Sequence, residues 1–144
     1  MDKKYIDASV FIQGILRDDN KSKEIILKIA NKEFIGVTSV LSWDEIVFVV
    51  QKFLGRDLAL REGKRFFNLP NIEFIEVRKE IILRAQKLIE KYRIKPRDAI
   101  HSATAVNLNI KEIISEDSDF DKIKELKRIS PKDLTSSPRS LYPE

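Results

Sequence analysis

Short apolar segments alternate with longer stretches of helical periodicity along most of this chain of 144 residues. The alternation limits the possible folds most strongly, because strands that alternate with helices favour an α/β domain with a mostly parallel central sheet. The predicted strands cover residues 5–6, 34–37, 72–77, 113–114 and 127–129. The predicted helices cover residues 10–16, 22–30, 40–54, 57–67, 80–92 and 96–109, with a helical turn at 120–123. Ser22 is the expected cap of the second helix, and Thr38 or Ser39 of the third.

The character of the sequence changes near its C-terminal end. Three of the five prolines lie within residues 131–144, with serines between them. Such a composition is typical of an extended or disordered segment. We therefore expect one domain over residues 1–131 and a flexible tail over residues 132–144.

The composition excludes several classes of protein. The chain has no cysteine and one histidine, His101, which excludes disulfide scaffolds, Cys/His zinc sites, iron–sulfur clusters and thiol catalysis. It contains no G-x-S-x-G motif for a serine nucleophile, and its four glycines form neither a dinucleotide-binding motif nor a P-loop. The longest apolar run covers only residues 46–50, and no signal peptide is visible. We expect a cytoplasmic protein that is not associated with a membrane.

Two acidic residues directly follow predicted strands. Asp7 comes after the strand at 5–6, and Asp117 follows the strand at 113–114. Sites in open α/β sheets form at the carboxyl ends of the strands. These two carboxylates are therefore expected to lie side by side.

Two further acids lie in helices with unusual surroundings. Glu45 belongs to a helix that is apolar nearly all round, where a carboxylate is costly unless a cation pairs with it. A salt bridge to Lys or Arg is the alternative to a metal ion at this position. Asp98 lies in the first turn of the helix that Pro96 opens, where the helix dipole favours its charged form. It is either an ordinary first-turn acid or one held near the sheet by the small residues that follow it.

A cluster of these four acids would need a counter-ion. Oxygen ligands without Cys or His select Mg²⁺ or Mn²⁺, and such a centre suits phosphodiester hydrolysis. The chain has 27 basic and 23 acidic residues, and a net charge of +4 permits nucleic-acid binding without requiring it. Without the four acids, 27 basic residues face 19 acidic ones, a balance of +8 that would help to hold a polyanion.

Four segments together resemble the PIN domain family, and most closely its VapC-like toxins: YIDASVFI, SVLSWDEIVFVV, KPRDAIHSATA and IISEDSDFDKI. The resemblance covers residues 3–131. It implies a three-layer α/β/α sandwich, cleavage of RNA with Mg²⁺ or Mn²⁺, a homodimer, and an antitoxin protein as a partner. By position, the catalytic and metal-binding acids would be Asp7, Glu45, Asp98 and Asp117. Ser9 and Ser115 would support the site, and Asp119 or Asp121 could share the role of Asp117.

Other interpretations have less support. A dehalogenase-type phosphatase needs a second aspartate two positions after Asp7, where this chain has Ser9, and a response-regulator receiver needs an acidic pair that is missing. The alternative function of a different class is a PIN-like module that binds RNA or protein without cutting. We expect His101 to be a packing or hydrogen-bonding residue rather than a general base. The helix at 40–54, with Phe66 and Phe67, is the expected dimer surface.

Overall fold

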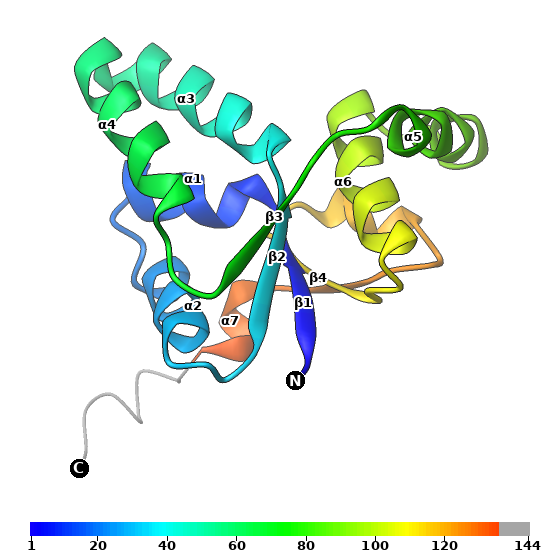
Figure 1. Ribbon diagram of the computed structural model, residues 1–144, viewed down its shortest axis with the longest axis horizontal. Coiled ribbons are helices and arrows are strands. Elements are labelled where there is room, and N and C mark those ends of the chain that lie inside the picture. Colours follow the sequence, from blue (N-terminus) through cyan, green and yellow to red (C-terminus); the bar gives the residue numbers. More distant parts are fainter. Residues whose placement is uncertain (136–144) are drawn as a thin grey trace.

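The computed structural model, which describes residues 1–135, has a five-stranded parallel sheet between two layers of helices (Figure 1). The strands are β1 (Lys3–Ile6), β2 (Ile35–Ser39), β3 (Ile72–Ile75), β4 (Glu112–Ile114) and β5 (Lys127–Ile129). They pair in the order β3-β2-β1-β4-β5, and every pair is parallel. The predicted parallel sheet is therefore confirmed.

Helices cover both faces of the sheet, as the three-layer prediction requires. The elements of one face are α1 (Ala8–Leu16), α2 (Asn20–Ala30), α3 (Leu41–Leu54), α4 (Arg56–Phe67) and α7 (Pro131–Leu134). The other face is covered by α5 (Lys79–Tyr92) and α6 (Pro96–Asn107), which pack against each other. A short 3₁₀-helix, η1 (Ser118–Lys122), connects β4 to β5.

Successive residues of the central strands enter two different cores. Tyr5 and Ile113 belong to the core under α5 and α6, whereas Ile6 and Ile114 belong to the core under α1 to α4. All four side chains are fully buried. A parallel sheet that is covered on both faces has continuous apolar strands of this kind.

The strand order reverses direction between β1 and β4. From β1 the chain moves outward to β2 and β3, and it then crosses to the other side of β1 to form β4 and β5. The backbone N–H of Asp7 donates to the carbonyl of Ile114 over 3.0 Å. The carboxyl ends of β1 and β4 are therefore adjacent at the switch point, where open α/β sheets place their binding sites.

Three details of the predicted helices differ in the structure. Helix α2 begins at Asn20, and its cap is Asp19 instead of Ser22, since the Asp19 side chain accepts from the N–H of Lys21 over 3.0 Å. Ser22 is buried within the first turn. Helix α6 ends at Asn107, two residues earlier than predicted, because Asn109 takes a left-handed conformation. In α3 the N-cap residue is Val40 instead of Thr38 or Ser39, although Ser39 Oγ accepts from the N–H of Leu41.

The first residues of the predicted flexible tail form a helix in the structure. Residues Pro131–Leu134 form α7, which contacts α2, and Leu134 packs against the core on that face. Proline at the first helical position favours such a start because its φ is already helical. Residues 136–144 lie outside the described residues, so the rest of the tail stays a prediction. No helix within residues 1–135 has the length and apolar content needed to span a bilayer.

Candidate metal centre

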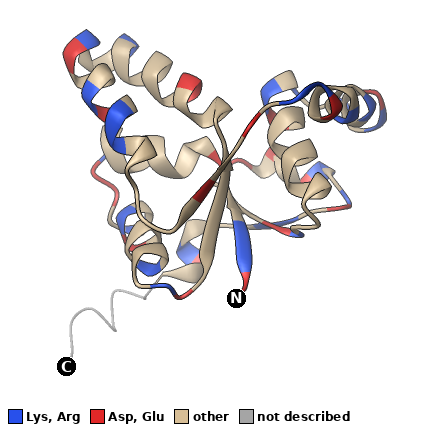
Figure 2. Cartoon of the chain, viewed as in Figure 1, with Lys and Arg blue, Asp and Glu red and all other residues tan. Residues whose placement is uncertain are grey.

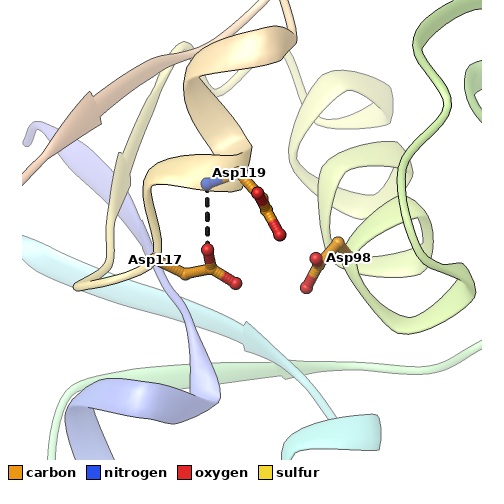
Figure 3. Close-up of side chains that lie close together, drawn as sticks. All are labelled: Asp98, Asp117 and Asp119. Carbon is orange, nitrogen blue, oxygen red and sulfur yellow. Dashed lines mark hydrogen bonds between the residues drawn. The ribbon is translucent and has the colours of Figure 1, made fainter.

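Three aspartates bring their carboxylates together next to the switch point (Figure 3). Asp98 comes from the first turn of α6, Asp117 from the turn between β4 and η1, and Asp119 from η1. One carboxylate oxygen from each lies within 4.8 Å of the other two, and all three side chains are half-buried. Within residues 1–135 this is the one such group of three or more His, Asp or Glu side chains. Carboxylate oxygens in this number suit a hard divalent cation.

The turn that carries Asp117 and Asp119 is held by its own polar side chains. Asp117 is the N-cap of η1, and its Oδ1 accepts from the backbone N–H of Asp119 over 2.9 Å (Figure 3). The N–H of Asp117 in turn donates to Ser115 Oγ over 2.9 Å. Such local contacts favour turns over continued strand. The sequence therefore leaves the strand at Ser115 and presents both carboxylates on one side.

Asp7 is tied to this turn through Ser115. Asp7 is only 5% exposed and is the N-cap residue of α1, yet its side chain makes no cap hydrogen bond. Instead its Oδ2 accepts from Ser115 Oγ over 2.7 Å. Ser9 Oγ lies 3.4 Å from Ser115 Oγ and accepts from the N–H of Glu116 over 3.4 Å. Both serines thus make hydrogen bonds beside the cluster, and their role in supporting a metal site stays a prediction.

Glu45 is paired with the single histidine. Its Oε1 lies 2.5 Å from His101 Nε2, and the same nitrogen lies 3.9 Å from Asp7 Oδ1. The expected alternative for Glu45 was a Lys or Arg partner, and the structure has His101 there. Burial lowers the pKa of His101, but the hydrogen bond to Glu45 and the charges of the surrounding acids outweigh it and raise that pKa. The histidine is fully buried and hydrogen-bonded on both ring nitrogens, which is the packing and hydrogen-bonding environment predicted for it.

Asp98 has an unsatisfied carboxylate oxygen. Its Oδ2 is buried and has no hydrogen-bond partner among the described residues. Burial, together with the charges of Asp117, Asp7 and Asp119, raises the pKa of Asp98 to about 6, while His101 opposes the rise. Buried oxygens normally have partners, and a cation would satisfy both the oxygen and the repulsion. The donor set and the orphaned oxygen therefore fit a hard divalent cation.

Asp121 does not belong to the cluster. Arg128 of β5 binds both of its carboxylate oxygens, over 2.9 and 3.3 Å, and also donates to the Ser115 carbonyl over 3.1 Å. Of the two residues that the sequence left open, Asp119 is the one beside Asp117. Lys122, on the next turn of η1, lies 3.5 Å from Asp119 and is exposed.

The structure brings two of the four predicted acids into the cluster and connects the other two to it through intervening side chains. Asp98 and Asp117 share the cluster with Asp119, whereas Asp7 and Glu45 are connected to it through Ser115 and His101. The contribution of His101 as the partner of Glu45 was missed in the sequence. No local signal reveals it, since the two residues are separated by 56 positions.

The chain matches one known family of α/β domains. The sequence matches the family model of the PIN domain over residues 4–126. None of the curated protein sequences compared with the chain matches it.

Several solved structures share the fold over most of their length. A DNA-bound VapBC from Salmonella typhimurium is 13% identical with a TM-score of 0.73, covering 91% of this chain and 99% of its own. The sarcin–ricin-loop-cleaving toxin VapC20 of Mycobacterium tuberculosis is 15% identical with a TM-score of 0.69, covering 83% and 94%. A toxin–antitoxin complex from Klebsiella pneumoniae is 19% identical with a TM-score of 0.65, covering 89% and 97%. At these identities the likeness establishes the fold.

Proposed function

This chain belongs to the PIN domain family, and on that premise we propose that it is a metal-dependent endoribonuclease and the cytoplasmic toxin of a toxin–antitoxin pair. The observation that carries the proposal is the orphaned, buried Oδ2 of Asp98 beside the carboxylates of Asp117 and Asp119. Three repelling carboxylates with an unsatisfied buried oxygen are costly in an empty protein site. A divalent cation removes that cost, and PIN domains are nucleases.

The acids would have different roles at this centre. Asp98, Asp117 and Asp119 would hold Mg²⁺ or Mn²⁺, and Asp7 and Glu45 would complete the acidic site from β1 and α3. The chemistry that the cation supplies when bound is Lewis-acid activation of water and neutralisation of the scissile phosphate. Ser115 orients Asp7 through its 2.7 Å hydrogen bond. Asp98, with its raised pKa, would hold a proton at mildly acidic pH, and a bound cation would favour its ionised form.

RNA is the substrate that the charge distribution supports. Lys and Arg residues are spread over α2, α4 and α5 (Figure 2). Lys95 and Arg97 are exposed at the start of α6 on either side of Pro96, immediately before Asp98, and Lys122 is exposed beside Asp119. Cations next to an acidic centre hold a phosphate backbone across it. The similarity to VapC20, described as cleaving the sarcin–ricin loop, supports loop RNA as the target class.

An antitoxin and a second copy of the chain are the proposed protein partners. Two of the structural relatives above are toxin–antitoxin complexes, and one of them is bound to DNA. Helices α3 and α4 expose large apolar side chains, which we define as the α3–α4 surface: Trp43, Phe48, Phe53, Leu54 and Leu60. Phe67 is exposed near it, whereas Phe66 lies in the core against Phe11 and Phe74, so the expectation that Phe66 contributes to a dimer was wrong.

The test is an RNA digest with Mg²⁺ or Mn²⁺, with EDTA and Asp98→Asn as controls. Attack by water predicts products with a 5′-phosphate and a 3′-hydroxyl, and no need for the 2′-hydroxyl of the substrate. Products with a 2′,3′-cyclic phosphate would contradict the mechanism. Cleavage that survives both controls would indicate a contaminant. A metal-loaded protein that binds RNA and cuts none would establish the alternative, a PIN-like binding module.

A further inference from the structure

A buried chain of hydrogen bonds ends at Glu45. It begins at the backbone N–H of Ser39, which donates to Tyr5 Oη over 3.1 Å. Tyr5 Oη lies 2.6 Å from His101 Nδ1, and His101 Nε2 lies 2.5 Å from Glu45 Oε1. Tyr5 and His101 are both fully buried, and their rings meet edge to face with centroids 5.6 Å apart. The chain thus connects β2, β1, α6 and α3.

The direction of these hydrogen bonds follows from the groups involved. A carboxylate oxygen only accepts, so His101 Nε2 carries a hydrogen and donates it to Glu45. The Tyr5 oxygen accepts from Ser39 and can serve the other ring nitrogen of His101 in either state, since it donates to a neutral ring and accepts from a charged one. A partner on Nδ1 fixes both the orientation of an imidazole and the nitrogen that bears its hydrogen.

The arrangement restricts a side chain that would otherwise be mobile. Glu45 has three rotatable bonds and projects from the first half of α3, with 19% of its side chain exposed. His101 occupies its Oε1 and leaves Oε2 available for another ligand. The same His101 nitrogen is 3.9 Å from Asp7 Oδ1, so the ring holds the two carboxylates as neighbours.

We propose that Tyr5 and His101 are positioning residues, which hold the Glu45 carboxylate beside Asp7 so that it helps to bind the divalent cation. This inference rests on the proposed function, because it assigns the pair a purpose at that metal centre. The rings touch no substrate; they act through Glu45. Partners of this kind behind a metal-binding group typically change metal affinity or activity about 10–100-fold when removed.

The first test is a titration of the full chain with Mn²⁺ alone, without RNA. His101→Leu removes the donor and should weaken Mn²⁺ binding by about 10–100-fold. His101→Gln, which can still donate at the same place, should recover most of the affinity, and Tyr5→Phe should lose part of it. Tyr92→Phe is the matched control, since the Tyr92 hydroxyl bonds Glu125 away from the site, and it should bind like the wild type.

The possible results separate the inference from the proposed function. A wild-type chain that binds no Mn²⁺ would contradict the metal-dependent function itself. Wild-type binding that is unchanged in folded His101→Leu and Tyr5→Phe would overturn the positioning role alone. If His101→Leu fails to fold, Tyr5→Phe against Tyr92→Phe decides the question. In the cleavage assay, a positioning role predicts a lower kcat with little change in KM.

The second test observes the histidine ring directly by NMR spectroscopy. Because the chain has one histidine, its ring ¹⁵N resonances need no assignment by mutation. We expect Nε2 to carry a hydrogen that exchanges slowly with water, since the ring is fully buried. Tyr5→Phe should shift the ring nitrogen resonances, and Tyr92→Phe should leave them unchanged. A ring with a bare Nε2, or one that is insensitive to Tyr5→Phe, would overturn the proposal.

Discussion

Ser115 Oγ donates to Asp7 Oδ2 over 2.7 Å, and this hydrogen bond joins the carboxyl ends of β4 and β1. Both residues are buried, Ser115 completely. The Asp7 carboxylate therefore has a hydroxyl next to the neighbouring strand as its hydrogen-bond donor where an exposed acid would have water. The same hydroxyl accepts from the N–H of Asp117. The Ser115 side chain thus orients the Asp7 carboxylate and also the turn that carries Asp117 and Asp119.

Replacing Ser115 by alanine should destabilise the protein. The change leaves the buried Asp7 oxygen without its donor and the Asp117 N–H without its acceptor, and an unsatisfied buried group costs about 1–3 kcal/mol. Urea unfolding monitored by circular dichroism measures the difference. Ser102→Ala is the matched control, because that buried hydroxyl only donates to a carbonyl within its own helix, that of Asp98. Equal losses in the two variants would argue against a special role of Ser115.

The Asp98→Asn substitution should remove a pH dependence of stability. The pKa of Asp98 is about 6 in the folded chain and near 3.8 when unperturbed, so the folded chain holds this proton more tightly. The free energy of unfolding of the metal-free protein should therefore fall as pH rises from about 4 to about 6, and should stay lower above that window. In EDTA, the Asp98→Asn variant should lack this pH-dependent component. Its free energy of unfolding at pH 7 should equal or exceed that of the wild type. Asp57→Asn, at an exposed position of α4, should retain the wild-type profile.

Divalent metal should raise the melting temperature. A ligand at 100 times its Kd stabilises a protein by about 2.7 kcal/mol, which for a domain of this size is roughly 5–10 °C. Asp119→Asn should abolish most of the shift with Mg²⁺ or Mn²⁺. Asp121→Asn, two residues away and paired with Arg128, should keep it. The reverse result would place the cation on the other side of η1.

The α3–α4 surface should mediate a two-fold dimer. Phe48 and Phe53 are 62% and 64% exposed, although aromatic rings contribute most when buried. Phe53→Glu should convert the protein to a monomer in sedimentation experiments at micromolar concentration. Leu83→Glu, at a 55% exposed position of α5 on the other face, should leave the assembly unchanged. A wild-type monomer at this concentration would contradict the dimer.

Much of the framework was predictable from local sequence patterns. Apolar segments that alternate with helical periodicity predicted the parallel sheet, because burial on both faces requires apolar strands and connecting helices. Asp7 and Asp117 could be placed near each other without coordinates, since parallel strands bring their carboxyl ends to one edge. Pro96 marked the start of α6, and Asp98 therefore had to lie in its first turn.

The finer arrangement of the site depended on contacts between distant segments. Whether Asp119 or Asp121 joins Asp117 is decided by Arg128, which lies in a later strand and binds Asp121. The sequence placed Glu45 in an apolar helix that requires a partner, and only the packing of α6 against the sheet supplies His101 as that partner. Hydrophobic periodicity determines which face of an element is buried, because it reflects the element's own geometry. The pairing of polar groups is decided by the relative positions of elements after packing, and that information exists only in the tertiary structure.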